Sequence, residues 1–460
     1  EVASHPERTD WHQYTRGFGH PRLVNALAGL YSKLLGVELN AHTDVLVTVG
    51  AYLSLYYAFT GWVNRGDEVI VLEPAYDCYA PQVRLVGGVP VPVPLELAAC
   101  AKSSADYHVN LAAIEAKITD RTKFIVINNP HNPTGKLFSR CKDHSNLSVL
   151  LKHLSLLWQR KFLIFPLSSH RLECLHLQGP PYLKRELEGI ADIVRRHDLL
   201  VIADEVYEWH VYHGQEMIRF ATIPGMYERT ITIGSAGKIF SITGWKLGWS
   251  IGPATLLAPL KAIHQNCVFT CSTPTQEAVA QAIEREVSVM WSNPEKSYFK
   301  TGLVSDLHRK RDRMATMLAA AGMKPIIPDS GYFMMADFSP LVQEDVLKSF
   351  DDSNDPLDFR FARWMCREKN LAMIPPSAFY SNEFKESNDH MVRVCFFKNL
   401  AMIPPSAFYS DEFKESNDHM VRVCFFKTDK VLDEAESILQ KFSLESRRCS
   451  KKASIDENEC

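Results

Sequence analysis

The chain has 460 residues, of which 46% are hydrophobic and 23% are charged, and its formal net charge is −3. This length excludes a small binding module and predicts a large enzyme domain with a smaller partner. The 51 basic and 54 acidic residues leave no excess of positive charge that would indicate nucleic-acid binding. The most apolar stretch, 147–167, is interrupted by charged residues, so no membrane span is predicted there.

Short β-branched runs that end in Gly, Pro or Asp recur along the chain and predict strands buried on both faces. Helical patterns lie between them, as at Tyr52–Val63 and Glu186–Arg196. This alternation predicts an α/β domain over 41–295 with a mostly parallel mixed sheet, followed by a smaller α+β domain over 296–442. The strands are expected at Val45–Val49, Glu68–Leu72, Lys123–Asn128, Leu199–Ala203, Thr230–Ile233 and Leu247–Ile251.

Three segments interrupt this plan. Residues 141–184 follow neither helical nor strand periodicity, and we expect them to be a disordered insertion. Residues 370–398 and 399–427 are tandem copies that differ only at Asn382 and Asp411, so one copy should fill the fold and part of the other should be extruded. The tail 443–460 is polar and charged, which is typical of disorder.

Cysteine usage bears on the compartment. Eleven cysteines without a CxxC pair indicate reduced thiols rather than a disulfide framework, and we expect a cytoplasmic protein. No signal peptide is visible at Glu1, and residues 1–40 are expected to be a truncated N-terminal segment. A mitochondrial location stays open as the alternative.

A glycine-rich motif, Gly234-Ser-Ala-Gly-Lys238, follows the predicted strand Thr230–Ile233. A lysine amine at a strand end among small residues can form a Schiff base with an aldehyde cofactor such as pyridoxal phosphate. Ser235 and Lys246 can reach a phosphate group. The alternative is a glycine-rich turn with two solvated lysines.

Two further motifs follow strand ends. In Ala203-Asp-Glu-Val-Tyr207, Asp204 can keep a pyridine nitrogen protonated, and Tyr207 can donate to the phenolic oxygen of the cofactor. The alternative for Asp204 is a helix cap. In Asn128-Asn-Pro-His-Asn-Pro-Thr-Gly135, the Asn132 amide can donate to the same phenolic oxygen. The alternative is an ordinary turn, since Asn-Pro pairs often mark turns that have no role in binding.

Upstream residues complete the predicted cofactor site. In Val49-Gly-Ala-Tyr52, a strand runs into a helix, and the backbone N–H groups of Ala51 and Tyr52 can bind a phosphate. Tyr76 offers a ring that can stack on the cofactor, and packing in the core is the alternative. The order of these motifs along the chain is more specific than any one of them.

This ordered set resembles the fold-type I pyridoxal-phosphate aminotransferases. Gln13-Tyr-Thr-Arg-Gly-Phe-Gly19, Pro130-His-Asn-Pro-Thr-Gly-Lys136 and Asp204-Glu-Val-Tyr-Glu-Trp209 resemble the kynurenine aminotransferases, also called cysteine-S-conjugate β-lyases, and the wider match leans toward the type III enzymes. The resemblance covers roughly 11–140 and 185–445. It implies a transaminase that moves the amino group of kynurenine, another aromatic or sulfur amino acid, or glutamine to a 2-oxo acid, with β-lyase side activity.

The resemblance also assigns roles to residues. It makes Lys238 the catalytic lysine that binds the cofactor, and it makes Tyr14 a phosphate ligand of a neighbouring subunit, which implies a homodimer. Either Arg393 or Arg422, which lie in the two repeat copies, would bind the substrate α-carboxylate. The insertion, the duplication and the absent N-terminal arm leave one alternative open, a homologue that binds the cofactor without turnover. Ala51, Tyr52, Tyr76, Asn132, Asp204, Tyr207, Ser235 and Lys246 would bind pyridoxal 5'-phosphate.

Overall fold

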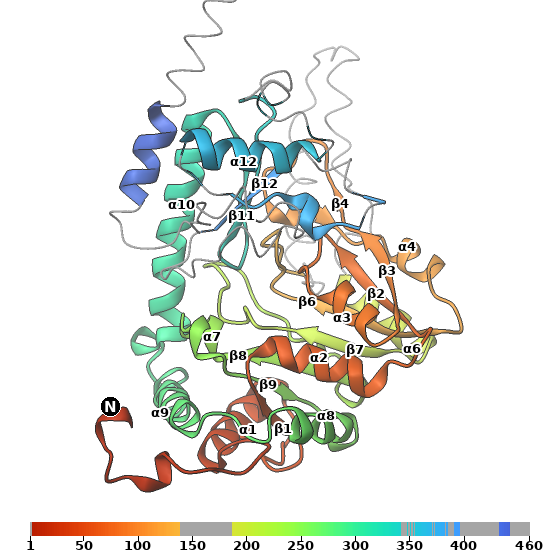
Figure 1. Ribbon diagram of the computed structural model, residues 1–460, viewed down its shortest axis with the longest axis vertical. Coiled ribbons are helices and arrows are strands. Elements are labelled where there is room, and N and C mark those ends of the chain that lie inside the picture. The colour runs from red at the N-terminus through yellow and green to blue at the C-terminus, as the bar shows by residue number, and fades with distance from the viewer. Residues whose placement is uncertain are drawn as a thin grey trace, which may run out of the picture.

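The computed structural model describes residues 2–138, 186–341, 347, 350, 353, 355–369, 371, 373–381, 383–384, 391–395 and 432–441. Within these residues a seven-stranded sheet, in the order β1-β9-β8-β7-β6-β2-β3, forms the centre of the larger part of the molecule, and helices cover both of its faces (Figure 1). Its strands are β1 (Val45–Thr48), β2 (Glu68–Glu73), β3 (Val89–Pro94), β6 (Thr122–Asn128), β7 (Leu200–Asp204), β8 (Thr230–Ser235) and β9 (Gly248–Ile251).

The predicted α/β class and the mostly parallel sheet are confirmed. Strands β3, β2, β6, β7 and β8 pair in parallel, whereas β9 runs antiparallel to both β8 and β1. The six expected strands are all present. The strand β3 was not expected, because its sequence alternates valine with proline. It pairs with β2 at the edge of the sheet, where a residue without a backbone N–H is tolerated.

Alternate residues of the strands enter two hydrophobic cores on opposite faces of the sheet. Val69 and Val71 of β2 belong to one core, which also holds the buried faces of α1 (Pro21–Leu35) and α2 (Ala51–Trp62). Ile70 and Leu72 belong to the other core, which holds the buried face of α6. The helix α6 spans Glu186–Arg196, as expected. Burial on both faces is why the strands read as continuous apolar runs.

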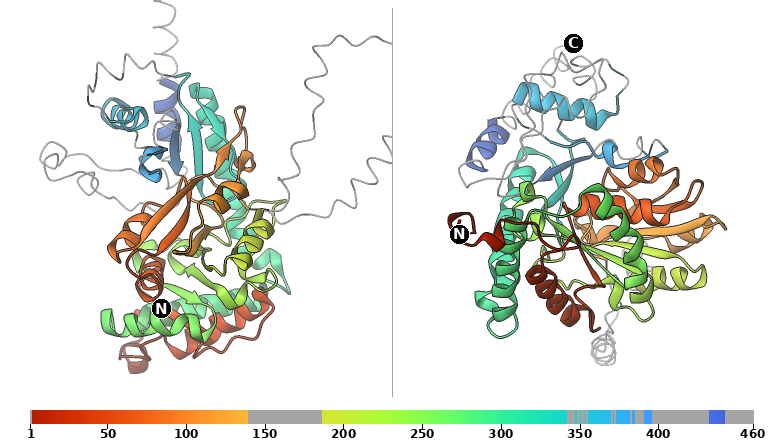
Figure 2. Two further views of the ribbon diagram at one scale, coloured as in Figure 1. Left: turned by 90° about the vertical axis from the view of Figure 1, so that its right-hand side faces the viewer. Right: turned by 60° about the horizontal axis from the view of Figure 1, so that its bottom comes forward.

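A smaller antiparallel sheet, in the order β10-β11-β12, lies above the large sheet in Figure 1 and in both views of Figure 2. Its strand β12 comes from the first repeat copy, whereas the second copy lies outside the described residues, as do the predicted insertion 141–184 and the tail 443–460. The remaining elements are α3 (Tyr79–Leu85), α4 (Leu111–Ala116), α7 (Ala236–Ile239), α8 (Ala254–Cys267), α9 (Thr273–Val289), α10 (Leu303–Ala321), α12 (Leu357–Lys369), a helix over 432–441, β4 (Glu96–Leu97), β5 (Tyr107–His108), β10 (Lys324–Ile326), β11 (Phe333–Asp337) and β12 (Met391–Cys395).

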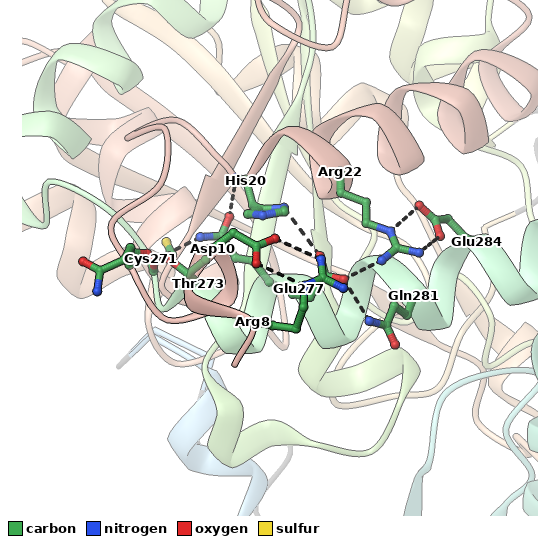
Figure 3. A network of polar contacts seen from close by, with 11 residues as sticks. Arg8, Asp10, His20, Arg22, Cys271, Thr273, Glu277, Gln281 and Glu284 are labelled. Atoms are coloured by element: carbon green, nitrogen blue, oxygen red, sulfur yellow. Dashed lines mark hydrogen bonds and ion pairs between the residues drawn. The ribbon is translucent and has the colours of Figure 1, made fainter. Parts of the chain in front are cut away.

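The N-terminal segment is fastened to α9 by polar contacts (Figure 3). The Arg22 guanidinium pairs with Glu277, which is almost fully buried, and also with Glu284, 2.7 Å away. The Thr273 hydroxyl donates to the backbone carbonyl of Gln13 at 2.6 Å. These contacts fix the segment that carries Tyr14. Across the described ranges, no helix has the length and apolar character that a membrane crossing requires.

Candidate active site

A pocket lies where the carboxyl ends of β7 and β8 meet the amino end of α2. Carboxyl ends of neighbouring parallel strands gather at one edge of a sheet, so side chains from distant parts of the sequence converge there. The pocket is lined by Gly50, Ala51, Tyr52, Leu55, Tyr76, Asn128, Asn132, Asp204, Val206, Tyr207, Ser235, Gly237, Lys238, Thr243, Lys246 and Leu247. It therefore brings together nine of the residues that the sequence predicted for cofactor binding and catalysis.

Lys238 projects from α7, directly after the end of β8. Its Nζ donates a hydrogen bond to the Tyr332 hydroxyl at 3.2 Å and lies 5.7 Å from the centroid of the Tyr207 ring. A glycine is required at the end of this strand, because a Cβ at Gly234 would lie 2.8 Å from the Tyr31 hydroxyl. The strand that carries the lysine thus packs closely against buried aromatic side chains.

Asp204 ends β7 and is buried, with 3% of its surface exposed. Burial raises the pKa of its carboxyl to about 6, and a hydrogen bond from the Tyr79 hydroxyl to Oδ2, at 2.5 Å, opposes that rise. Sequence reasoning missed Tyr79. The sequence feature that could have identified Tyr79 is its position three residues after Tyr76. In the structure the two rings are in edge contact, with centroids 5.8 Å apart.

The other carboxylate oxygen of Asp204, Oδ1, is buried and has no hydrogen-bond partner among the described residues. An unpaired buried carboxylate oxygen is costly unless a donor from outside the chain satisfies it. A protonated ring nitrogen in the pocket would be such a donor. The observation therefore fits the cofactor that the sequence resemblance implies.

A network of amides links the Asn-Pro turn to β7 and to the smaller sheet. Asn128, which sequence reasoning did not assign to the site, accepts from the backbone N–H of Asn132 at 2.7 Å and donates to the Asp204 carbonyl at 2.9 Å. The Asn132 Oδ1 accepts from Arg393 Nη1 at 2.7 Å. Because Arg393 occupies the amide oxygen, the amide nitrogen of Asn132 is left as the donor for a ligand in the pocket.

Arg393 comes from β12 and is held in a buried aromatic clamp. Its guanidinium carbon lies 4.7 Å from the centroid of the Phe333 ring and 4.5 Å from that of Phe379, and 6% of the residue is exposed. Its Nε lacks a hydrogen-bond partner in the part of the chain that the structure describes. A planar guanidinium is suited to bidentate binding of a carboxylate, and the unpaired Nε is available for such a contact. Arg422, the other predicted candidate, lies outside the described residues.

The amino end of α2 forms a site for an anion. Gly50 precedes α2 with φ of 77°, and a Cβ at that position would lie 3.6 Å from Lys246 Nζ. A Cβ at Gly248 would lie 2.5 Å from the backbone nitrogen of Ala51, so a glycine there lets β9 approach the helix end. A lysine beside a helix N-terminus adds its charge to the partial positive charge of the helix end, and a phosphate would stabilise both.

The aromatic residues of the site differ in their exposure. Tyr76 lines the pocket, and burial raises the pKa of its hydroxyl. Burial also raises the pKa of the Tyr207 hydroxyl well above its usual value, so this group stays protonated and can donate at neutral pH. Tyr14 lies outside the pocket and is 82% exposed, with its ring in edge contact with Phe269 at 5.7 Å.

The donors, the acceptors and the positive end of the helix therefore fit each part of pyridoxal phosphate. The unpaired Asp204 Oδ1 suits the ring nitrogen, Asn132 and Tyr207 suit the phenolic oxygen, and the end of α2 suits the phosphate. Lys238 brings its amine into the same pocket. An amine and a carboxylate in this pocket, with a guanidinium bonded to the pocket-lining Asn132, are groups that can together hold an amino acid and move its proton.

Comparisons with known proteins agree with this geometry. The family described as aminotransferase class I and II matches residues 2–150 and 179–403. The chain is 43% identical to kynurenine--oxoglutarate transaminase 3 of Homo sapiens over 387 residues, which are 84% of this chain and 74% of the relative. It is 41% identical to kynurenine--oxoglutarate transaminase 1 of Mus musculus over 392 residues, which are 84% of this chain and 80% of the relative.

Solved structures share the fold. Bna3p from Saccharomyces cerevisiae matches 96% of this chain and 86% of its own with a TM-score of 0.74 and 26% sequence identity. The N-succinyldiaminopimelate aminotransferase from Mycobacterium tuberculosis matches 96% of this chain and 88% of its own with a TM-score of 0.69 and 29% identity. The predicted fold-type I architecture is thus confirmed.

Proposed function

The chain belongs to the class I and II aminotransferases, and we propose that it moves the amino group of kynurenine to a 2-oxo acid. Another aromatic or sulfur amino acid, or glutamine, is a further donor under this proposal. The family and the fold imply pyridoxal 5'-phosphate as the cofactor. The observation that carries the proposal is the convergence of Lys238, the unpaired Asp204 carboxylate and Asn132, itself bonded to Arg393, at one pocket. The names of the relatives support kynurenine as the donor.

Under this proposal, each cofactor-facing residue of the chain has one task. Asp204 holds a proton on the ring nitrogen, and Tyr79 keeps the Asp204 carboxylate ionised. Asn132 and Tyr207 donate to the phenolic oxygen. Tyr76 packs against the ring face. The phosphate is bound by Ala51, Tyr52, Ser235 and Lys246.

When bound, pyridoxal phosphate supplies a ring that stabilises negative charge at the substrate Cα. Lys238 would hold the cofactor through its amine, and that amine, once free, would take the proton from the substrate Cα and later return it. Arg393 binds the α-carboxylate and thereby orients the Cα–H bond toward Lys238. The reaction exchanges an amino acid for its 2-oxo acid, and a second 2-oxo acid reverses the sequence, which predicts ping-pong kinetics.

We also propose a β-lyase side activity. If Cβ of the substrate carries a thiol leaving group, the negative charge at Cα can expel it once Lys238 has removed the Cα proton. The same residues serve both reactions, because both begin with this proton transfer. The balance between them is set by the leaving group on Cβ.

The test is a visible absorption spectrum of the purified chain with pyridoxal phosphate, recorded before and after kynurenine is added. We expect a visible band that is lost in Lys238→Ala and changes to the spectrum of pyridoxamine phosphate with kynurenine. Lys261→Ala is the matched control, since the Lys261 amine donates to the backbone carbonyl of His42 at 3.1 Å, away from the pocket residues. A bound cofactor whose spectrum kynurenine leaves unchanged would contradict the substrate, and no band at all would contradict the proposal.

We further propose that the protein acts as a homodimer in which Tyr14 reaches the phosphate of the neighbouring subunit. The exposed pair of Tyr14 and Phe269 supports this, since exposed aromatic side chains are enriched at interfaces. Mixing inactive Tyr14→Ala and Lys238→Ala chains should restore activity, because one site of each mixed dimer would be intact. Mixtures that stay inactive although sedimentation shows a mixed dimer would exclude a Tyr14 that acts across subunits.

A further inference from the structure

We propose that Tyr332 is a further catalytic residue, whose hydroxyl holds the Lys238 amine and links the proton on that amine to the Tyr207 hydroxyl. The inference rests on the proposed role of Lys238. Tyr332 was not singled out by the sequence, because it lies 94 residues after its partner and directly before β11. It is a buried residue, with 6% of its surface exposed.

Tyr332 contacts both reactive groups. Its hydroxyl accepts from Lys238 Nζ at 3.2 Å and also makes a side-chain hydrogen bond with Tyr207. The Tyr332 and Tyr207 rings meet edge to face with centroids 5.2 Å apart. The Tyr332 hydroxyl therefore joins the Lys238 amine and the Tyr207 hydroxyl into one row of hydrogen bonds, and both Lys238 and Tyr207 line the pocket.

The backbone around Tyr332 is fixed to the segments that follow β6 and β7. The preceding residue, Gly331, adopts φ of 72°, and its N–H donates to the His210 carbonyl at 2.7 Å. The Gly331 carbonyl accepts from the Tyr212 hydroxyl at 2.8 Å, and the Ser330 hydroxyl donates to the Gly135 carbonyl at 2.9 Å. A side chain on so constrained a backbone is held in place before the cofactor binds, which is what a catalytic contact requires.

The donors and acceptors in the row admit two directions. When the Lys238 nitrogen carries a proton, it donates a hydrogen bond to the Tyr332 oxygen. The Tyr332 O–H then donates to the Tyr207 oxygen, and the Tyr207 O–H can donate into the pocket. When the Lys238 nitrogen becomes an acceptor, the Tyr332 O–H turns toward it, and Tyr207 can donate to Tyr332 instead. The proton state of Lys238 thus sets the direction in which Tyr207 donates.

Other titratable groups lie near this row, and besides burial the charges of Tyr76 and Asp204 add to the raised pKa of the Tyr207 hydroxyl. The charge of Lys238 acts on Asp204 and on His210. Burial, followed by the charge of Lys238, lowers the pKa of His210 to about 3, so its ring is neutral at neutral pH. Asp204 reaches Lys238 as a charge and not as a hydrogen-bond partner. The direct hydrogen bond of the lysine is the one that it donates to the Tyr332 hydroxyl.

The test is a pH titration of the visible absorption band of the enzyme loaded with pyridoxal phosphate, which reports the proton on the Lys238 nitrogen. In Tyr332→Phe the ring contacts stay and the acceptor is lost. We expect the titration midpoint to fall by about 1 pH unit or more, because the lost bond stabilised the protonated nitrogen. Circular dichroism of both proteins establishes that the variant is folded.

A matched control and a double variant separate this role from a packing role. Tyr57→Phe removes a buried hydroxyl that has no hydrogen-bond partner among the described residues and makes no contact with the lysine, and it should leave the midpoint unchanged. If the Tyr332 hydroxyl links Lys238 to Tyr207, Tyr332→Phe should shift the midpoint in a Tyr207→Phe background by less than half of the shift that it causes in the wild type.

The outcomes distinguish the inference from the function on which it rests. A folded Tyr332→Phe enzyme whose midpoint equals that of the wild type overturns the inference and leaves the proposed function intact. A full shift that persists in the Tyr207→Phe background overturns the link between the hydroxyls. A wild-type band that survives in Lys238→Ala overturns both the role of the lysine and the inference.

Discussion

The hydrogen bond between Tyr79 and Asp204 should set the pH range over which the protein binds its cofactor. Tyr79→Phe removes the hydroxyl that donates to Asp204 Oδ2 at 2.5 Å and keeps the ring in place. A hydrogen bond to a charged group contributes about 1.5–3 kcal/mol, and one pKa unit corresponds to about 1.4 kcal/mol. The variant should therefore raise the pKa of the Asp204 carboxyl from about 6 to about 7–8 in the cofactor-free protein.

This change has a measurable size at neutral pH. With a pKa of about 6, about nine-tenths of the Asp204 carboxyls are ionised at pH 7. With a pKa near 7.5, the ionised share falls to about a quarter. Because the ionised carboxylate would, under the proposed function, pair with the protonated ring nitrogen, cofactor affinity should fall about fourfold at pH 7 and return almost to the wild-type value near pH 9.

The assay is the dissociation constant of pyridoxal phosphate for the cofactor-free protein, measured by absorbance between pH 5.5 and pH 9. The acid limb of the Tyr79→Phe profile should lie 1–2 pH units above that of the wild type, by the estimate of about 1.5–3 kcal/mol. Tyr57→Phe is the control, since the Tyr57 hydroxyl is buried and makes no hydrogen bond to any described residue. Superimposable profiles for Tyr79→Phe and wild type would refute the reasoning.

Three further changes test other parts of the structure. A methyl group at Gly234 would collide with buried aromatic side chains, so Gly234→Ala should lower the free energy of unfolding by about 1–3 kcal/mol. Gly244→Ala is the control, since a methyl group there meets nothing within 4 Å. Equal melting temperatures for the two variants would contradict this packing. Burial raises the pKa of Glu205 to about 8, above its value of 4.5 in the unfolded chain, so its contribution to stability is complete below pH 4.5 and is lost as the pH rises through 8. Glu205→Gln should therefore reduce the pH dependence of the unfolding free energy over that range by up to ~5 kcal/mol. A pH dependence that stays unchanged would argue against a protonated Glu205. Arg393→Ala should weaken amino-acid binding about 30-fold or more, whereas Arg422→Ala should have little effect. The assignment of the substrate carboxylate to an arginine of the repeat fails if neither variant weakens amino-acid binding.

Local sequence was enough to predict much of the site. Asp204 ends a strand, Lys238 follows one closely, and Asn132 follows one within a short turn, so the parallel sheet alone brings all three to one edge. The strand boundaries could be predicted because burial on both faces leaves an apolar run that ends at polar residues or glycine. The edge strand β3 escaped prediction, because its prolines are acceptable only where one side of a strand is unpaired.

Other features depend on partners that are far away in the sequence. Tyr79 and Tyr332 read as ordinary core aromatics, since the groups that they contact lie 125 and 94 residues away. Arg393 and Arg422 have the same neighbours in sequence, so no local pattern could choose between them. The pairing of β12 with β11, and the hydrogen bond from Arg393 to Asn132, assign the first copy to the site.

The sequence by itself determined the α/β class, the order of the cofactor motifs and the identity of the catalytic lysine proposed here, because each follows from local periodicity or from residues a few positions apart. The tertiary structure alone decided which copy of the repeat completes the small sheet. It also decided which hydroxyls meet Asp204 and Lys238. The physical reason is that hydrogen bonds and desolvation act through space, so the charge state of a buried carboxylate or amine depends on neighbours that chain distance does not reveal.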